Sequence, residues 1–262
     1  MKTQSTFKTL PIAARYTIVL FFAAGLAAAV LSILCQPAFS ARRLLLLLPI
    51  TVLTARAKVN LFKGSTLSLL TSAVLLAVIN EGPAVAVLLA VCGVIAQTLL
   101  PSKRLVLHQL AFNTGMIAVT VTATWWTYRL LADGQSEAPL SAVTIATVLA
   151  SFTYFLGNSI SVSLIISLTK RISMFRVWFD HFLYSAPSFV IAGLLSLGAI
   201  GLVSSHSFAV TMALLGAISI AYYCSVRVTA EPVRCGEGGN LGHRPPQKYS
   251  PTIGDIVARP YV

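Results

Sequence analysis

The chain is divided into long apolar segments by short stretches of charged or turn-forming residues. Most of these segments approach the roughly 20 apolar residues that a helix needs to cross about 30 Å of hydrocarbon. There are eight of them: Tyr16–Leu34, Leu44–Thr54, Ser65–Ile79, Pro83–Leu100, Leu110–Tyr128, Leu140–Leu168, Phe182–Val203 and Phe208–Val226. The pattern predicts an all-α fold, a polytopic bundle of about eight transmembrane helices.

Two of these segments are irregular. Leu44–Thr54 is short and contains Pro49, so we expect a tilted, broken or re-entrant helix there. Leu140–Leu168 is long, and Gly157-Asn158 interrupts it. The first segment has an apolar run longer than a signal-peptide core, which predicts an uncleaved membrane anchor.

Composition supports the membrane interpretation. Hydrophobic residues make up 56% of the chain and charged residues 10%, against roughly 25% charged in an ordinary soluble domain. The net charge of +12 fits cytoplasmic loops that meet anionic lipid. We therefore expect membrane lipids as partners and no nucleic acid.

The distribution of positive charge predicts an orientation. If the N-terminus is cytoplasmic, sixteen of the nineteen Lys and Arg residues fall on the cytoplasmic side, leaving Arg42, Arg43 and Arg129 outside. This bias satisfies the positive-inside rule. It places both chain ends in the cytoplasm.

The predicted organisation has three parts. Residues 1–15 form a cytoplasmic N-terminus, and residues 16–226 form the transmembrane bundle. Residues 227–262 are rich in proline and glycine and poor in apolar residues, so we expect a disordered cytoplasmic tail.

Motifs for catalysis are missing from the sequence. It contains no GxxxxGK[ST], GxSxG or HExxH pattern, and its four cysteines have no CxxC spacing. We therefore expect no enzymatic activity, no catalytic residue, no metal site and no cofactor.

Polar and aromatic residues within or beside the apolar segments are the candidates for function. Amides such as Gln97 inside an apolar helix must face other helices or a cavity, because an unpaired amide in hydrocarbon is costly. Aromatic residues near a helix end can form an interfacial belt or line a mouth. A ligand site, if the chain has one, is predicted at Glu81, Asn113, Trp125, Trp126 and Asn158. The alternatives are interhelical hydrogen bonds for the amides, a solvated turn for Glu81 and a lipid belt for the tryptophans.

A short stretch near residue 175 alternates aromatic and basic residues. Phe175, Trp178 and Phe179 are interleaved with Arg171 and Arg176. This pattern predicts an amphipathic segment on the cytoplasmic face, in contact with lipid or with a soluble partner.

Several short motifs occur in an order that resembles a known family. They are Ala55–Leu61, Lys63–Leu69, Gly82-Pro83-Ala84, Phe112-Asn113, Tyr154–Asn158, Arg176–Trp178 and Phe182–Ser188. Together they are similar to the bacterial multi-helix membrane sensor domains that stand N-terminal to HD-type phosphodiesterase or diguanylate cyclase (GGDEF) modules. The resemblance implies a multi-pass region of the bacterial inner membrane that regulates cytoplasmic cyclic-dinucleotide signalling.

The sequence departs from this family after the eighth apolar segment. There the chain continues into the tail described above, and we expect no catalytic output domain in it. The favoured function is a sensor-like or anchoring domain that works with a cytoplasmic partner or as a homo-oligomer. The alternatives are a small-molecule transporter or its substrate-binding subunit, and a structural subunit of a membrane complex.

Overall fold

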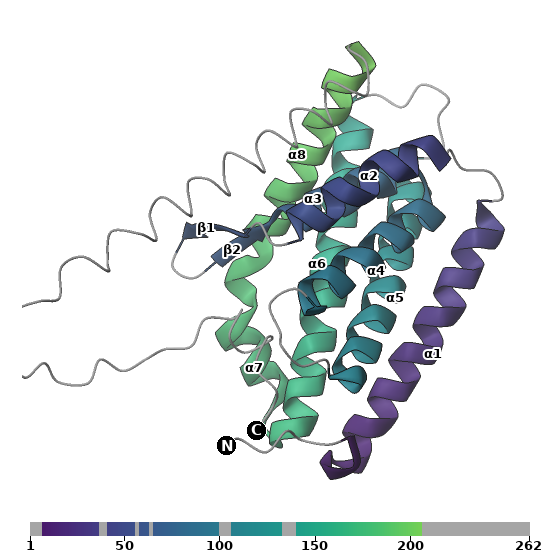
Figure 1. Cartoon of the computed structure of the whole chain (residues 1–262). Coiled ribbons are helices and arrows are strands. Elements are labelled where there is room, and N and C mark those ends of the chain that lie inside the picture. The colour runs from purple at the N-terminus through teal and green to yellow at the C-terminus, as the bar shows by residue number, and fades with distance from the viewer. Residues whose placement is uncertain are drawn as a thin grey trace, which may run out of the picture.

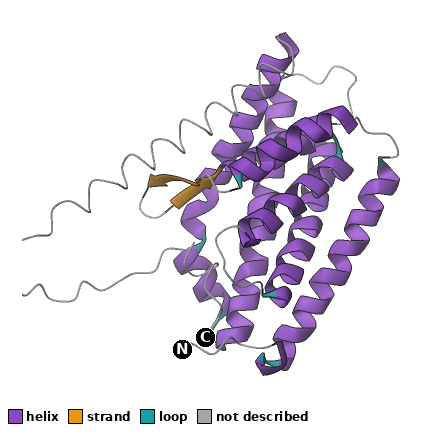
Figure 2. Cartoon of the chain, in the orientation of Figure 1, coloured by secondary structure: helices purple, strands orange, loops and turns teal. Residues whose placement is uncertain are grey.

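The computed structural model describes residues 7–36, 41–55, 58–62, 65–99, 106–132 and 140–205. Within them the chain is helical, as expected, apart from one short pair of strands (Figure 2). The α-helices are α1 (Ile12–Cys35), α2 (Ala41–Thr54), α3 (Leu69–Asn80), α4 (Pro83–Leu99), α5 (Leu107–Ala132), α6 (Leu140–Lys170), α7 (Met174–His181) and α8 (Ala186–Ser205). Two 3-10 turns, Phe7–Thr9 and Leu183–Ser185, precede α1 and α8.

Helix α5 is the centre of the bundle. It packs along α1, α4 and α6, while α8 packs against α3 and α6 on the other side (Figure 1). The closest approach to α1 is at Gly25 and Gly115, where a Cβ on Gly115 would lie 2.3 Å from the Phe21 carbonyl oxygen. Small residues allow such close approach between membrane helices. This crossing fixes the position of α1 on α5.

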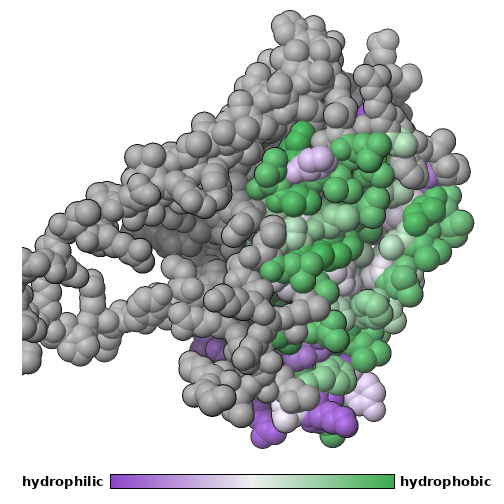
Figure 3. Space-filling model, viewed as in Figure 1, coloured by the Kyte–Doolittle hydropathy of each residue, from purple (hydrophilic) through white to green (hydrophobic). Residues whose placement is uncertain are grey.

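Two described helices are long and apolar enough to cross a membrane, α1 and α6. A third span is formed if α7 and α8, which meet at a bend of 61°, are counted together. The outer surface of α1 suits lipid, since Leu20 is 67% exposed and Leu34 is 71% exposed. Figure 3 shows apolar residues over the side of the bundle and hydrophilic residues gathered at the end where α1 begins.

The third predicted segment, Ser65–Ile79, is wrong at its start. Ser65–Ser68 forms strand β2, which pairs antiparallel with β1 (Lys58–Phe62), and the helix begins only at Leu69. The resulting α3 has 12 residues, about 18 Å at 1.5 Å per residue, and is shorter than the hydrocarbon layer. Residues 70–78 are all buried, so α3 is a core element of the bundle.

The sixth predicted segment is not interrupted. Helix α6 runs through Gly157-Asn158 without a break over 31 residues. A Cβ on Gly157 would lie 2.8 Å from side-chain atoms of Thr120, so this glycine serves close packing of α6 on α5. The pattern of the sequence could not distinguish a packing glycine from a helix break.

The other predicted segments agree with the helices of the structure to different degrees. Helix α2 is short, as expected, and it continues through Pro49 without a break over its 14 residues. The seventh segment was predicted from Phe182, but α8 begins at Ala186, after a separate helix α7 and a 3-10 turn. The predicted eighth segment, Phe208–Val226, and the tail lie outside the described residues.

Candidate functional site

The five residues predicted to bind a ligand fall in different places. Glu81 and Trp125 line one cavity, and Asn113 lines a second cavity near the opposite end of α5. Trp126 and Asn158 are not among the lining residues of either. The predicted site is therefore divided, and only Glu81 and Trp125 are brought together.

The larger cavity, here called the Glu81 cavity, has a volume of about 320 Å³. It lies where the end of α1, the α3–α4 turn and the last turns of α5 meet. Its lining residues are Cys35, Gln36, Val78, Ile79, Asn80, Glu81, Gly82, Pro83, Trp125, Tyr128 and Arg129. The volume falls at the lower end of the range of small-molecule sites, and the lining combines apolar walls with a few polar groups.

Gln36 holds the α3–α4 turn in place. Its side-chain amide donates to the Glu81 carbonyl and accepts from the Ala84 backbone N–H at 3.0 Å. The first N–H groups of a helix have no partner within the helix, and the Gln36 oxygen supplies one for α4. The end of α1 is thereby fastened to the start of α4.

Gly82 gives the turn its shape. Its φ of +90° is a conformation that favours glycine, and a Cβ there would lie 2.6 Å from the Gln36 Oε1. The N–H groups of Glu81 and Gly82 both donate to the Ala77 carbonyl, which ends α3. The glycine therefore serves both the tight turn and the approach of Gln36.

Glu81 is less solvated than the sequence suggested. Its side chain is only 7% exposed, and its Oε1 lies 3.4 Å from Nη1 of Arg43 on α2. Burial raises the pKa of Glu81 above its ordinary value of 4.5, and the nearby Arg43 charge opposes that rise. The expectation of a solvated turn residue is corrected: Glu81 is a largely buried carboxyl group with a cationic partner.

The two neighbouring tryptophans have different environments. Trp125 is 7% exposed and faces the cavity, with the Arg129 guanidinium 5.3 Å from its ring centroid. That distance is within the range of cation–π attraction. Trp126 is 48% exposed and meets Trp125 edge on. The interfacial-belt interpretation suits Trp126, whereas Trp125 is a wall of the cavity.

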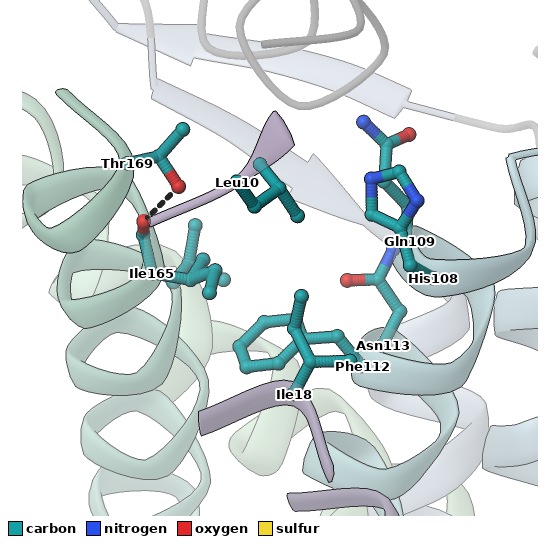
Figure 4. Close-up of a pocket in the computed structure, with 9 residues that line it drawn as sticks. Leu10, Ile18, His108, Gln109, Phe112, Asn113, Ile165 and Thr169 are labelled. Carbon is teal, nitrogen blue, oxygen red and sulfur yellow. Dashed lines mark hydrogen bonds between the residues drawn. The ribbon is translucent and has the colours of Figure 1, made fainter. Parts of the chain in front are cut away.

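The second cavity, here called the Gln109 cavity, has a volume of about 30 Å³ (Figure 4). His108, Gln109 and Asn113 of α5 form one side, and Thr169 of α6 lies across from them. Thr169 donates to the Ile165 carbonyl of its own helix at 2.7 Å. Among the described residues, the Gln109 Nε2 is buried without a hydrogen-bond partner. This volume suits one or two waters rather than an organic ligand.

Polar residues elsewhere in the helices mainly serve packing. Gln97 donates to the Ala55 carbonyl at 2.9 Å, which confirms the interhelical hydrogen bond expected for it. Several threonines donate to the carbonyl four residues earlier in their own helix, as Thr124 does to Thr120. Asn158 is half-buried in α6. Within the described part of the chain, no group of three His, Cys, Asp or Glu residues is arranged to hold a metal.

Comparison of the chain with protein-family models, with curated proteins and with solved structures finds no match. The candidate site therefore rests on its geometry. Sequence reasoning missed Gln36 and Arg43 as neighbours of Glu81, because residues about 40 positions apart come together only in the fold. A usable indication existed in the charges, since Arg43, Glu81 and Arg129 all fall on the same predicted side of the membrane.

Proposed function

We propose that this chain is a sensor-like domain of a bacterial signalling protein, a multi-pass bundle in the inner membrane that binds a small ligand in the Glu81 cavity. The observation that carries the proposal is the junction of three elements around that cavity: α1, the α3–α4 turn and α5. A ligand there contacts all three, so its binding free energy can favour one helix arrangement over another.

The route from the cavity to the other side of the membrane is α5. This helix has 26 residues, about 39 Å, and Gly115 on it meets Gly25 of α1 between the two cavities. A change in the α1–α5 contact at the Glu81 cavity is thereby transmitted to the other end of α5, near the end of α6 and the start of α7. A cytoplasmic partner or a second copy of the chain binds there and responds to the change.

We propose eight spans with both chain ends in the cytoplasm. The placement of charges supports this topology. Arg43, Glu81 and Arg129 lie around one end of the described bundle. Lys170 and Arg171 follow Thr169 at the other end, where Thr169 and Leu10 line the same cavity. The Glu81 cavity then opens on the periplasmic side.

Labelling of Cys35 tests this orientation. The thiol is exposed at the Glu81 cavity. In a variant whose other three cysteines are replaced by alanine, a membrane-impermeant maleimide should label Cys35 in intact cells. The control moves the cysteine to the exposed Ser173 between α6 and α7, where labelling should need permeabilised membranes. Labelling of Ser173→Cys but not Cys35 in intact cells would refute the topology.

Ligand binding is tested by a thermal-shift screen on purified protein. A compound that fills the Glu81 cavity should raise the Tm. At a concentration one hundred times its Kd, it should stabilise the folded protein by about 2.7 kcal/mol. Trp125→Ala should abolish the shift. Trp126→Ala, a change of the same size at the exposed neighbour, should retain it. If a broad small-molecule library shifts no Tm while the protein is folded, the sensing proposal fails.

A transporter is the second candidate, and discontinuous helices favour it. Helices α3 and α4 are short and apolar, and α7 meets α8 at 61°. Broken helices line the substrate sites of many secondary transporters. Uptake by reconstituted vesicles separates the two functions: accumulation of a compound that also shifts the Tm indicates transport, while binding without accumulation indicates sensing.

A further inference from the structure

Helix α7 presents three different faces. Val177 is 2% exposed and Trp178 is half-buried, and both face the bundle. Phe175 and Phe179 are 69% and 53% exposed. Arg176 and Asp180 are also exposed. At 100° per residue, the phenylalanines and the charged pair occupy adjacent sectors of the helix, away from the buried face.

The buried face fixes the rotation of the helix. The indole N–H of Trp178 donates to the Ser159 hydroxyl of α6 at 2.9 Å. The Trp178 ring also lies 6.2 Å from the Phe155 ring, which belongs to the core of α6. The sequence pattern had grouped Trp178 with the two phenylalanines. The structure separates them, because Trp178 is the anchor that turns Phe175 and Phe179 outward.

The outward phenylalanines continue an apolar surface. They are four residues apart, and therefore neighbours on one face of the helix. Ile172, before the helix, is 45% exposed, and Leu183, just after it, is 41% exposed. On helix α8, Ile191 is also partly exposed, at 39%. A strip of this kind beside a membrane helix suits the acyl region of a bilayer.

Exposed positive charges lie before α7 and on it. Lys170 and Arg171 are exposed at the C-terminus of α6, and Arg176 is exposed on α7 itself. Arg171 has a φ of +55°, a turn conformation that begins the segment leading to α7. Asp180 is the acid on the helix. The turn before α7 and α7 itself thus carry both exposed cations and exposed aromatic residues.

We propose that α7 and the turn before it form a binding site for an anionic phospholipid. Phe175 and Phe179 enter the acyl layer, and Arg171 and Arg176 bind the headgroup phosphate. Arginine suits this role, since its planar group donates two parallel hydrogen bonds to phosphate. The adjacent sectors of α7 match the boundary between acyl chains and headgroups. In the proposed topology these phenylalanines face the bilayer, so a soluble acidic protein would have to displace lipid from them.

The test titrates the purified full chain with phosphatidylglycerol or phosphatidylcholine and counts bound lipids by native mass spectrometry. Wild-type protein should bind phosphatidylglycerol more tightly, by about fivefold for each cation that contributes. Arg171→Gln/Arg176→Gln should remove this preference, and Arg171→Lys/Arg176→Lys should keep part of it. The lysine variant shows that a loss of preference is not a loss of folding.

A matched pair of single variants separates a site from diffuse attraction. Lys8→Gln removes one exposed charge near the start of α1, as Arg176→Gln does on α7. Only Arg176→Gln should lower the preference. Phe175→Ser/Phe179→Ser should weaken binding of both lipids. The proposal is overturned if wild-type protein binds the two lipids equally, if Lys8→Gln has the same effect as Arg176→Gln, or if a soluble acidic protein occupies α7 instead.

Discussion

The two ends of α5 carry polar residues for different purposes. At the Glu81 cavity, the polar groups have partners: Gln36 bonds to the turn, Glu81 pairs with Arg43, and Arg129 lies over Trp125. At the Gln109 cavity, neighbouring helices close around the polar side chains and the Gln109 Nε2 has no partner within the described structure. One cavity has about 320 Å³ and the other about 30 Å³.

The difference teaches what opens a cavity within a helical bundle. Around Glu81, a sharp turn with a positive-φ glycine joins two helices, and backbone there cannot fill space as packed side chains do. Around Gln109, the facing side chains Ile165 and Phe112 are large and buried. Polar residues in a membrane helix therefore indicate a ligand site only when the surrounding backbone leaves room.

The largest effect on stability is expected where α1 crosses α5, between the two cavities. This crossing positions a wall of each cavity. Gly115→Ala places a Cβ 2.3 Å from backbone of α1, which cannot shift as a flexible side chain would. We expect a loss of about 3 kcal/mol, the upper part of the range for overpacking. Thermal unfolding in detergent measures it.

Gly198→Ala is the matched control for that crossing. A Cβ at Gly198 in α8 meets nothing within 4 Å in the part of the chain that the structure describes. This substitution should leave stability unchanged or raise it by up to about 1 kcal/mol, because alanine is the better helix former. Equal effects of the two substitutions would mean that the α1–α5 contact is not close.

The next effect concerns the turn beside the Glu81 cavity. Gln36→Leu removes the partner of the Ala84 N–H and of the Glu81 carbonyl. Leaving such groups unpaired should cost about 2 kcal/mol. Gln97→Leu removes a single interhelical bond, to Ala55, and should cost about half as much. If Gln97→Leu is the more harmful change, the proposed fastening of α1 to α4 is wrong.

A smaller effect is expected in the pH dependence of stability. The pKa of Glu81 is raised in the folded state, mainly by burial, so the folded protein holds this proton more tightly than the unfolded chain. The resulting stabilisation is complete below the unfolded value near 4.5 and is lost as pH rises through the folded pKa.

Glu81→Gln should remove that part of the pH dependence while keeping the shape of the side chain. When Tm is plotted against pH, the slopes for wild type and variant should therefore differ most above pH 4.5. Identical slopes would show that Glu81 titrates as a solvated residue. No comparable slope is expected from a substitution at Gln109, which carries no charge.

The smallest effect is expected at the Gln109 cavity. Gln109→Leu replaces a side chain whose Nε2 is buried without a hydrogen-bond partner among the described residues by an apolar group of similar length. Stability should stay the same or rise by up to about 1 kcal/mol. Ser163→Ala provides a parallel case, since the Ser163 Oγ is also buried without a partner among the described residues. A loss above about 2 kcal/mol in Gln109→Leu would indicate that the amide binds something essential, such as ordered water.

Sequence reasoning was most successful where hydropathy alone decides the outcome. Tyr16–Leu34 lies within α1, and Pro83–Leu100 begins where α4 begins. The short α2 with Pro49 was also predicted. In the candidate site, Glu81 and Trp125 were named together, because an acid and an aromatic residue at predicted helix ends can meet at one edge. Asn113 and Asn158 were named for their polarity; Asn113 lines the other cavity, and Asn158 lines neither cavity.

The sequence by itself determined that this chain is built from apolar helices and which of them contain polar groups, because those properties depend on residues close together in the chain. Tertiary structure alone decided that α1 has its apolar side chains exposed while α3 is buried, although the two are equally apolar. It also decided that Gln36, Arg43 and Glu81 meet. The physical reason is that burial and pairing depend on which helices become neighbours, and a local pattern of hydrophobicity does not contain that information.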